Sequence, residues 1–261
     1  MKNDRMFIVP NNDLEAMRII EVLKENNEIF LVTKQSWGAS WDNLEGNIKT
    51  EIHEAWKQYQ LGIATKFEIY GIELQGETPN ILCENIDHHT YENDDRSNKF
   101  SSLEQVLHLL NKPISDWDKY ISANDAGYIP AMEKAGTSPI MIKQIRALDR
   151  KAQGITSEQE EQAIEAIEKL EKYNDLTLIR SVHSKCSIYT DKLYGEYKNL
   201  LILSEDGESN FYGDTKIIEK LFESFQGWEG GKLEEGYGFW GGYADQKDVE
   251  KLVKVFYSIH F

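Results

Sequence analysis

Short apolar runs alternate with helical periodicity between residues 5 and 130. After the first run, Ala16, Ile19 and Leu23 recur at the spacing of one face of an amphipathic helix. A further helical stretch is predicted over residues 41–59. The runs predicted to be strands are 6–9, 28–33, 67–72 and 81–86. This alternation predicts an α/β fold with a doubly wound, mainly parallel sheet, because parallel strands are usually joined by helical crossovers.

Two capping boxes predict where later helices begin. Ser101 is followed by Glu104, and Thr156 by Gln159, which is the spacing at which two side chains satisfy the first backbone amides of a helix. Helical periodicity covers residues 140–173, with a break before the second box. The acidic residues after Thr156 are predicted to be the solvated face of a linker helix.

The predicted linker helix separates two regions in which strands and helices alternate, and the first region is the longer one. We expect a larger α/β domain over 1–138, a helical linker over 139–174 and a smaller α/β domain over 175–261. In the smaller domain, strands are predicted at 176–182, 187–190 and 199–204, and helices at 215–225 and 245–257.

The net charge of −16 narrows the range of partners. Binding a long phosphate backbone relies on a basic surface that releases counterions, so no long nucleic acid is expected as a ligand. A small phosphorylated substrate remains compatible, because divalent ions can supply positive charge. No run approaches the roughly twenty apolar residues of a membrane helix, so we expect no membrane partner and a cytoplasmic protein.

Cys83 and Cys186 lie in apolar runs and are expected to be buried thiols.

The tripeptide Asp87-His88-His89 directly follows the predicted strand 81–86. Open α/β sheets bind ligands at the carboxyl ends of their strands, so this position favours a functional site. The alternative is a polar turn in which both histidines are hydrogen-bonded.

Acidic residues stand at other strand ends or turns that such a sheet brings near this tripeptide. Asp13 and Glu15 follow the first predicted strand, and Glu73 ends the third. Asp125 lies where a helix predicted to begin at Ser115 is expected to end, near residues 124–127. Carboxylates with one imidazole suit Mn²⁺ or Mg²⁺, whereas zinc and iron–sulfur sites favour thiolates.

This order of residues resembles the DHH phosphoesterase superfamily, which includes exonucleases, small-oligonucleotide phosphatases, cyclic-dinucleotide phosphodiesterases and family II pyrophosphatases. Its four motifs are a strand with a His-x-x-x-Asp-x-Asp loop, an acidic strand end, Asp-His-His and a later aspartate. Asp13-Leu14-Glu15-Ala16 is similar to the end of the first motif, and Glu73 stands in the place of the second. The tripeptide matches the third motif, and Asp125 resembles the fourth. The resemblance covers residues 5–130 and implies a metal-dependent phosphoester hydrolase with a small C-terminal DHHA1-like domain.

The chain departs from this pattern in its first two motifs. Val9 stands where the first motif places a metal-binding histidine, and Glu15 and Glu73 replace aspartates. Because valine offers no lone pair, one of the two metal positions of the family is expected to be weak. The expected ligands are Asp13, Glu15, Glu73, His88 and Asp125. Asp87 is expected to orient a histidine, and His89 to donate a hydrogen bond to a phosphate oxygen.

A cluster of glycines and aromatic residues precedes the last predicted helix. Glycines allow backbone amides to approach a phosphate, and an aromatic ring can stack on a base. The resemblance implies a glycine-rich substrate-binding loop here, and a glycine turn packed by aromatic rings is the alternative. The residues expected to bind substrate are His183, Lys185, Gly230, Gly231, Tyr237, Gly238, Trp240, Gly241 and Gly242. Trp37 and Trp41 are expected to serve core or interdomain packing, and stacking on a substrate ring is the alternative.

The leading hypothesis is hydrolysis of a phosphomonoester or phosphodiester in a small, nucleotide-like substrate with the help of Mn²⁺ or Mg²⁺. The main alternative is a non-catalytic binding or regulatory protein that keeps the fold with a degraded metal centre. A third is non-hydrolytic chemistry at the same centre. A measurement of metal content distinguishes the hydrolase from the non-catalytic protein. Product analysis on a panel of substrates distinguishes non-hydrolytic chemistry from hydrolysis.

Overall fold

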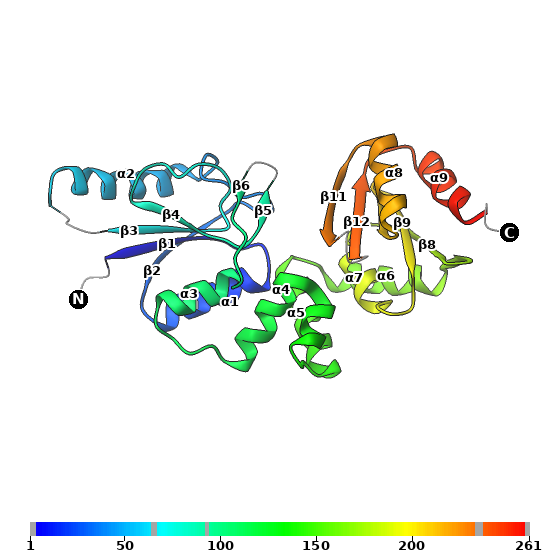
Figure 1. Cartoon of the computed structure of the whole chain (residues 1–261), viewed down its shortest axis with the longest axis horizontal. Helices are drawn as coiled ribbons and strands as arrows, with labels where there is room; N and C mark the ends of the chain where they lie inside the picture. The colour runs from blue at the N-terminus through cyan, green and yellow to red at the C-terminus, as the bar shows by residue number, and fades with distance from the viewer. Residues whose placement is uncertain (1–3, 64–66, 92–93, 233–236, 259–261) are drawn as a thin grey trace. The chain divides into compact units, whose positions relative to one another are not determined.

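The computed structural model describes residues 4–63, 67–91, 94–232 and 237–258 (Figure 1). The chain forms two compact units that divide between Gly154 and Ile155. Each unit contains a sheet with helices packed on it, which confirms the predicted α/β class with a second sheet unit. Within these described ranges, no helix is both long enough and apolar enough to cross a membrane.

The first unit is built on a four-stranded parallel sheet in the order β2-β1-β3-β4. Its strands are β1 (Arg5–Pro10), β2 (Ile29–Thr33), β3 (Glu68–Ile72) and β4 (Cys83–Ile86). Every residue of β1 after Arg5 is buried, as expected for a parallel strand covered on both faces. Successive side chains of a strand point to opposite faces, so Met6 and Ile8 share one hydrophobic cluster whereas Phe7 stacks on Tyr70.

Helices cover both faces of this sheet. Helix α2 (Gly46–Gln60) lies on one face, and α1 (Leu14–Glu25) and α3 (Ser102–Leu109) lie on the other (Figure 1). Two more helices, α4 (Asp116–Lys134) and α5 (Pro139–Ala152), pack against α1. A short hairpin of β5 (Thr90–Tyr91) and β6 (Asp94–Asp95) follows β4. The predicted doubly wound arrangement is therefore present, and all four strands end at one edge.

Helix α4 bends in its middle. Gly127 and Tyr128 have non-helical backbone angles, and Tyr128 has a φ of 59°, in the left-handed region that non-glycine residues rarely adopt. Pro130 follows within the second half and lacks the amide that a regular helix would use. The first, regular half ends near residue 127 as predicted. Asp125 therefore lies at the bend.

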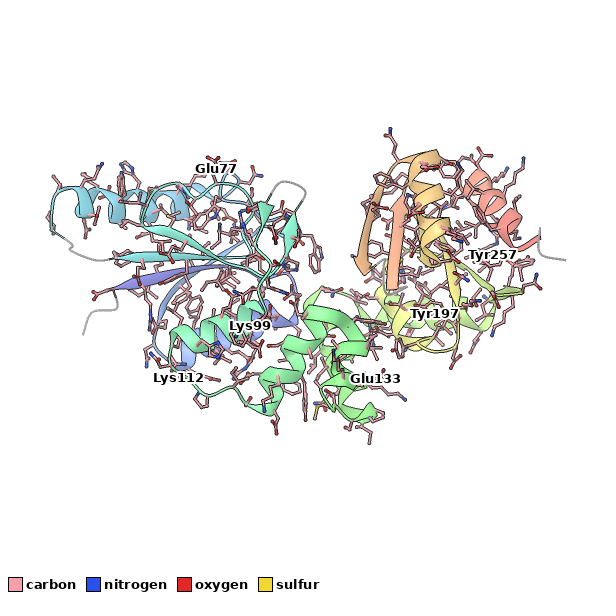
Figure 2. The ribbon with its side chains drawn as sticks, in the orientation of Figure 1. Glu77, Lys99, Lys112, Glu133, Tyr197 and Tyr257 are labelled. Carbon is pink, nitrogen blue, oxygen red and sulfur yellow. The ribbon has the colours of Figure 1, made fainter. Side chains whose placement is uncertain are left out.

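The second unit is built on a six-stranded mixed sheet in the order β11-β12-β10-β9-β8-β7. Its strands are β7 (Glu171–Tyr173), β8 (Leu176–Ser181), β9 (Asn199–Ser204), β10 (Ser209–Gly213), β11 (Trp228–Lys232) and β12 (Tyr237–Gly242). Its helices are α6 (Ser157–Glu168), α7 (Ser187–Lys192), α8 (Thr215–Phe225) and α9 (Gln246–Ser258). Tyr197 and Tyr257, labelled in Figure 2, pack against separate hydrophobic clusters of this unit.

Several local predictions are wrong in detail. Residues 187–190 form the start of α7 instead of a strand, because Ile188 and Tyr189 are buried against β8 and β9 and tertiary packing overrides strand propensity. The stretch 171–173 is strand β7 instead of helix. The segment expected as a linker, 139–174, divides between the units, since α5 packs on α1 and α4 while α6 packs on β8.

Candidate metal centre

Acidic and histidine side chains leave three neighbouring strands at the same edge of the first sheet. Asp13 follows β1 and caps α1, and Glu73 directly follows β3. Asp87, His88 and His89 directly follow β4. Parallel strands carry their carboxyl ends to one edge, so these residues meet although they are far apart in the sequence.

The imidazole of His88 lies at the centre of the cluster. Its Nε2 is 2.7 Å from Asp125 Oδ2, 3.5 Å from Glu73 Oε1 and 4.0 Å from Glu15 Oε2. His89 joins from the rim, with its Nδ1 4.0 Å from Glu73 Oε1. One donor atom from each of Glu73, His88, His89 and Asp125 lies within 4.8 Å of the others. The bend in α4 brings Asp125 into this group.

Several buried ligand-type atoms of the cluster lack an aligned hydrogen bond. Glu15 Oε2, His88 Nε2 and Asp125 Oδ2 are buried, and none of them has a hydrogen bond of acceptable geometry. His88 Nε2 and Asp125 Oδ2 therefore form a close ion-pair contact that lacks the geometry of an aligned hydrogen bond. Buried polar atoms are almost always paired, so their convergence fits a bound cation. Carboxylate oxygens with one imidazole fit a hard divalent ion such as Mn²⁺ or Mg²⁺.

The electrostatics of the cluster agree with this fit. Burial and the nearby Asp125 raise the pKa of Asp13 to about 8. The same two causes raise the pKa of Glu15 well above its usual range. Burial lowers the pKa of His88, but contact with Asp125 and Glu73 outweighs it and raises that pKa to about 10. Without a cation, the protein thus holds protons among its carboxylates and on His88.

The first turn of α3 holds the two glutamates. Leu103 N donates to Glu15 Oε1 at 3.1 Å, and Ser102 Oγ donates to Glu73 Oε1 at 2.8 Å. A helix N-terminus favours negative charge, so α3 stabilises both carboxylates. The longer glutamate side chain allows Glu15 to reach α3 with one oxygen and the cluster with the other. The capping box at Ser101 predicted the start of α3, but its role beside the site was not predicted.

Asp87 is fully engaged in hydrogen bonds. Its Oδ1 accepts from the backbone amides of His88 and His89 and lies 3.0 Å from His89 Nδ1. Its Oδ2 accepts from Tyr91 Oη at 3.0 Å and from Arg96 Nη1 at 3.4 Å. Burial would raise the pKa of Asp87, but the hydrogen bonds from His89 and Tyr91 outweigh it and lower that pKa. Asp87 therefore orients His89 and is not a free metal ligand.

The first-motif residues are only partly in the cluster. Asp13 is buried, and its Oδ1 accepts from Ala16 N at 2.8 Å as the cap of α1. It is not among the four residues whose donor atoms converge in the described part of the chain. Val9 is fully buried in β1 and offers no donor atom. A second metal position would thus lack one nitrogen ligand.

A cavity of about 1110 Å³ is lined in part by Asp87. Asp87, Asn85, Arg96, Gln105 and Glu77 are among the residues that line it. Glu77 lies at the top of the first unit in Figure 2, across the unit from Lys112. None of Glu73, His88, His89 and Asp125 is among its lining residues.

The glycines of the second unit lie in strands β11 and β12, not in a loop. A Cβ at Gly230 would lie 2.9 Å from the ring of Phe239, and one at Gly242 would lie 2.7 Å from the ring of Trp240. A Cβ at Gly241 would overlap the ring of Trp228, which packs on β12 at this position. The glycines therefore make room for aromatic rings. Gly231, paired with Gly238, is exposed and has a φ of 77°.

The other residues predicted to bind substrate differ in how far their side chains are exposed to solvent. Trp240 is fully buried, and its Nε1 donates to Gln226 O at 2.7 Å, so its ring is part of the core. His183 is buried, with Nε2 3.0 Å from Gln159 O, whereas Lys185 is exposed. The side chain of Tyr237 lies outside the described residues.

The two tryptophans of the first unit differ. Trp41 is buried, and its Nε1 donates to Asn85 Oδ1 at 2.7 Å, as expected for a packing residue. Trp37 is 68% exposed, so core packing does not explain it.

No protein-family model and no curated protein matches this chain. Solved structures that align with nearly its whole length include the following two. One is a pGpG-specific phosphodiesterase, PggH, from Vibrio cholerae, which is 13% identical, covers 97% of each chain and has a TM-score of 0.48. The other is an uncharacterized protein from Helicobacter pylori G27, which is 11% identical, covers 97% of this chain and 99% of that one, and has a TM-score of 0.31.

Proposed function

We propose that this chain is a divalent-metal-dependent hydrolase of a phosphomonoester or phosphodiester in a small, nucleotide-like substrate, as in the DHH phosphoesterase superfamily. The observation that carries the proposal is the convergence of Glu15 Oε2, His88 Nε2 and Asp125 Oδ2. These atoms are buried, have no hydrogen-bond partner and belong to ligand types that Mn²⁺ and Mg²⁺ accept.

The metal would be held by Glu15, Glu73, His88 and Asp125, with Asp13 next to them at the start of α1. When bound, such an ion acts as a Lewis acid toward phosphoryl oxygens and makes water a stronger nucleophile. It also supplies the positive charge that a phosphate needs in a protein of net charge −16. The acidic surface favours a small substrate over a long nucleic acid.

His89 would contact the substrate. Its Nδ1 is held by Asp87 at 3.0 Å, and its side chain is 44% exposed, so Nε2 is the nitrogen that remains for a ligand. The hydrogen bond that His89 donates to Asp87 is the main cause that raises the pKa of His89, which favours the protonated ring. A protonated Nε2 would donate a hydrogen bond to a phosphate oxygen as negative charge develops.

A binding or regulatory protein is the second candidate, and one observation favours it. Val9 is fully buried and apolar where the family places a metal-binding histidine. If hydrolysis requires two ions, a chain that holds one ion firmly would bind a phosphorylated ligand without cleaving it.

The proposal is tested with protein stripped by EDTA and reloaded with Mn²⁺ or Mg²⁺. The substrates are p-nitrophenyl phosphate, bis-p-nitrophenyl phosphate, a 5′-mononucleotide and a linear dinucleotide, with phosphate or nucleotide release as the readout. We expect metal-dependent hydrolysis that His88→Ala abolishes. His53→Ala is the control, since His53 is an exposed residue of α2. Activity that survives EDTA contradicts the proposal, and tight metal binding without hydrolysis of any substrate favours the binding protein.

A further inference from the structure

A buried ion pair on α5 lies beside the candidate metal centre. Arg146 Nη1 donates to Asp149 Oδ2 at 2.8 Å, and both residues are buried, at 7% and 4% exposure. Buried charges are costly unless they are paired and hydrogen-bonded, so a pair in this position calls for an explanation. Helix α5 packs on both α1 and α4, the helices whose segments carry Asp13 and Asp125.

One side of the pair holds the start of α1. Asp149 Oδ1 accepts from Leu14 N at 3.2 Å, and Leu14 directly follows Asp13. The first amides of a helix lack partners within the helix, so an outside acceptor fixes where the helix begins. Asp149 thereby fixes the backbone next to Asp13.

The other side of the pair holds the bend of α4. Arg146 Nη1 also donates to Asn124 Oδ1 at 2.8 Å, and Asn124 directly precedes Asp125. The guanidinium carbon lies 4.6 Å from the ring centroid of Tyr128, the residue with a φ of 59°. A non-glycine residue in this region is strained and persists where its surroundings hold it. Arg146 supplies two of the contacts that hold this bend.

We propose that the Arg146–Asp149 pair is a positioning device that sets the separation between the segment carrying Asp13 and the segment carrying Asp125, and thereby the metal affinity of the site. This inference rests on the proposed metal centre. Neither residue touches the metal ligands' donor atoms in any contact described above. Both act through Leu14 and Asn124, the direct neighbours of the two aspartates.

The test compares Mn²⁺ affinity, measured by the loss of the free-ion signal in electron paramagnetic resonance. Outer residues that orient metal ligands typically change affinity by about 10–100-fold when substituted, so Arg146→Met and Asp149→Asn should weaken binding by about that factor. Arg146→Lys should recover part of the loss, because one nitrogen, Nη1, donates both to Asn124 and to Asp149. The matched control is Lys143→Met, an exposed residue on the same helix, which should leave the affinity unchanged.

A purely structural pair would give a different result. In that case Arg146→Met would lower the melting temperature, while the folded protein kept its Mn²⁺ affinity within about twofold, and this outcome overturns the proposal. The double variant Arg146→Met with Asp149→Asn should bind no more weakly than the poorer single variant, because the two residues act as one unit. Additive losses would overturn it as well. If Arg146→Met does not fold, the Mn²⁺ affinities of the single variants Arg146→Lys and Asp149→Asn decide whether the pair has the positioning role.

Failure of the metal proposal would be recognised separately. If the unmodified protein binds no Mn²⁺, the proposed function fails. The positioning role is then decided by amide hydrogen exchange in metal-free protein. At Leu14 and residues 124–128, the backbone amides of the Asp149→Asn variant should exchange faster than those of the unmodified protein. The same amides of the Arg146→Lys variant should exchange at the unmodified rate. Unchanged exchange in the Asp149→Asn variant would overturn the positioning role too.

Discussion

His88 Nε2 and Asp125 Oδ2 lie 2.7 Å apart, yet neither atom has a hydrogen bond of acceptable geometry. A buried imidazole nitrogen and a carboxylate oxygen that meet without an aligned hydrogen bond are ligand types that a divalent cation accepts. His88 comes from the end of β4 and Asp125 from the bend of α4, so the contact joins the sheet edge to the helical layer.

Mn²⁺ should bind at one tight position and at most weakly at a second. The donor atoms around His88 are complete enough for one ion, whereas the buried Val9 offers no ligand to a second. Isothermal titration calorimetry should therefore give one strong site, which His88→Ala weakens by about 100-fold while His53→Ala does not. Two equally tight sites in the unmodified protein would contradict this prediction.

The metal-free first unit should lose stability as the pH rises from 6.5 to 8. Asp13 has a pKa of about 8 in the folded unit, whereas in the unfolded chain it releases its proton near 3.8. Between these pH values the folded unit holds one more proton than the unfolded chain, so its free energy of unfolding falls as the pH rises. His88, with a pKa raised from 6.5 to about 10, contributes stability that is complete below 6.5 and is lost as pH rises through 10. Both effects have the same sign, at up to about 1.4 kcal/mol per pH unit for each group.

Thermal unfolding in EDTA at several pH values measures this slope. Saturating Mn²⁺ should flatten or reverse it, because metal affinity rises as the ligands lose their protons. A stability in EDTA that increases between pH 6.5 and 8 would show that these groups are not buried as described.

Glu15→Gln should have opposite effects on stability and on metal binding. Glu15 is 3% exposed, and its Oε2 has no partner, so at pH 8 a neutral amide should stabilise the metal-free unit by at least about 1 kcal/mol. The same change removes a charged ligand, so Mn²⁺ should bind at least about tenfold more weakly. Melting curves with and without Mn²⁺ test both effects, and Glu51→Gln on the exposed side of α2 is the control. A variant that gains stability and keeps its full affinity would exclude Glu15 as a ligand.

Gly71→Ala should destabilise the first unit. A Cβ there would overlap the ring of Trp41 and lie 2.9 Å from Leu74, in a packed region beside β3. Overpacking of this kind costs about 1–3 kcal/mol. Gly46→Ala at the start of α2, where no atom lies within 4 Å of the added carbon, should be neutral or slightly stabilising. Equal melting temperatures for the two variants would refute the tight packing of Trp41 on β3.

The sequence by itself determined the local elements of this protein. Apolar periodicity predicted β1, β3, α1 and α8, because each depends on which face of a short segment is apolar. The capping boxes at Ser101 and Thr156 predicted the starts of α3 and α6, since they involve neighbouring residues alone. Strand ends also placed Glu73 and the Asp-His-His tripeptide at one edge of the sheet.

Only the tertiary structure decided which of these groups meet and what they do. Asp87 proved to be saturated by hydrogen bonds, and the glycines of the second unit proved to make room for aromatic rings within strands. The contacts of Glu15 with α3, and of Arg146 with Asn124, join segments that no local pattern relates. Sequence periodicity reports which face of an element is buried, whereas the partner atom across that face depends on how separate elements pack.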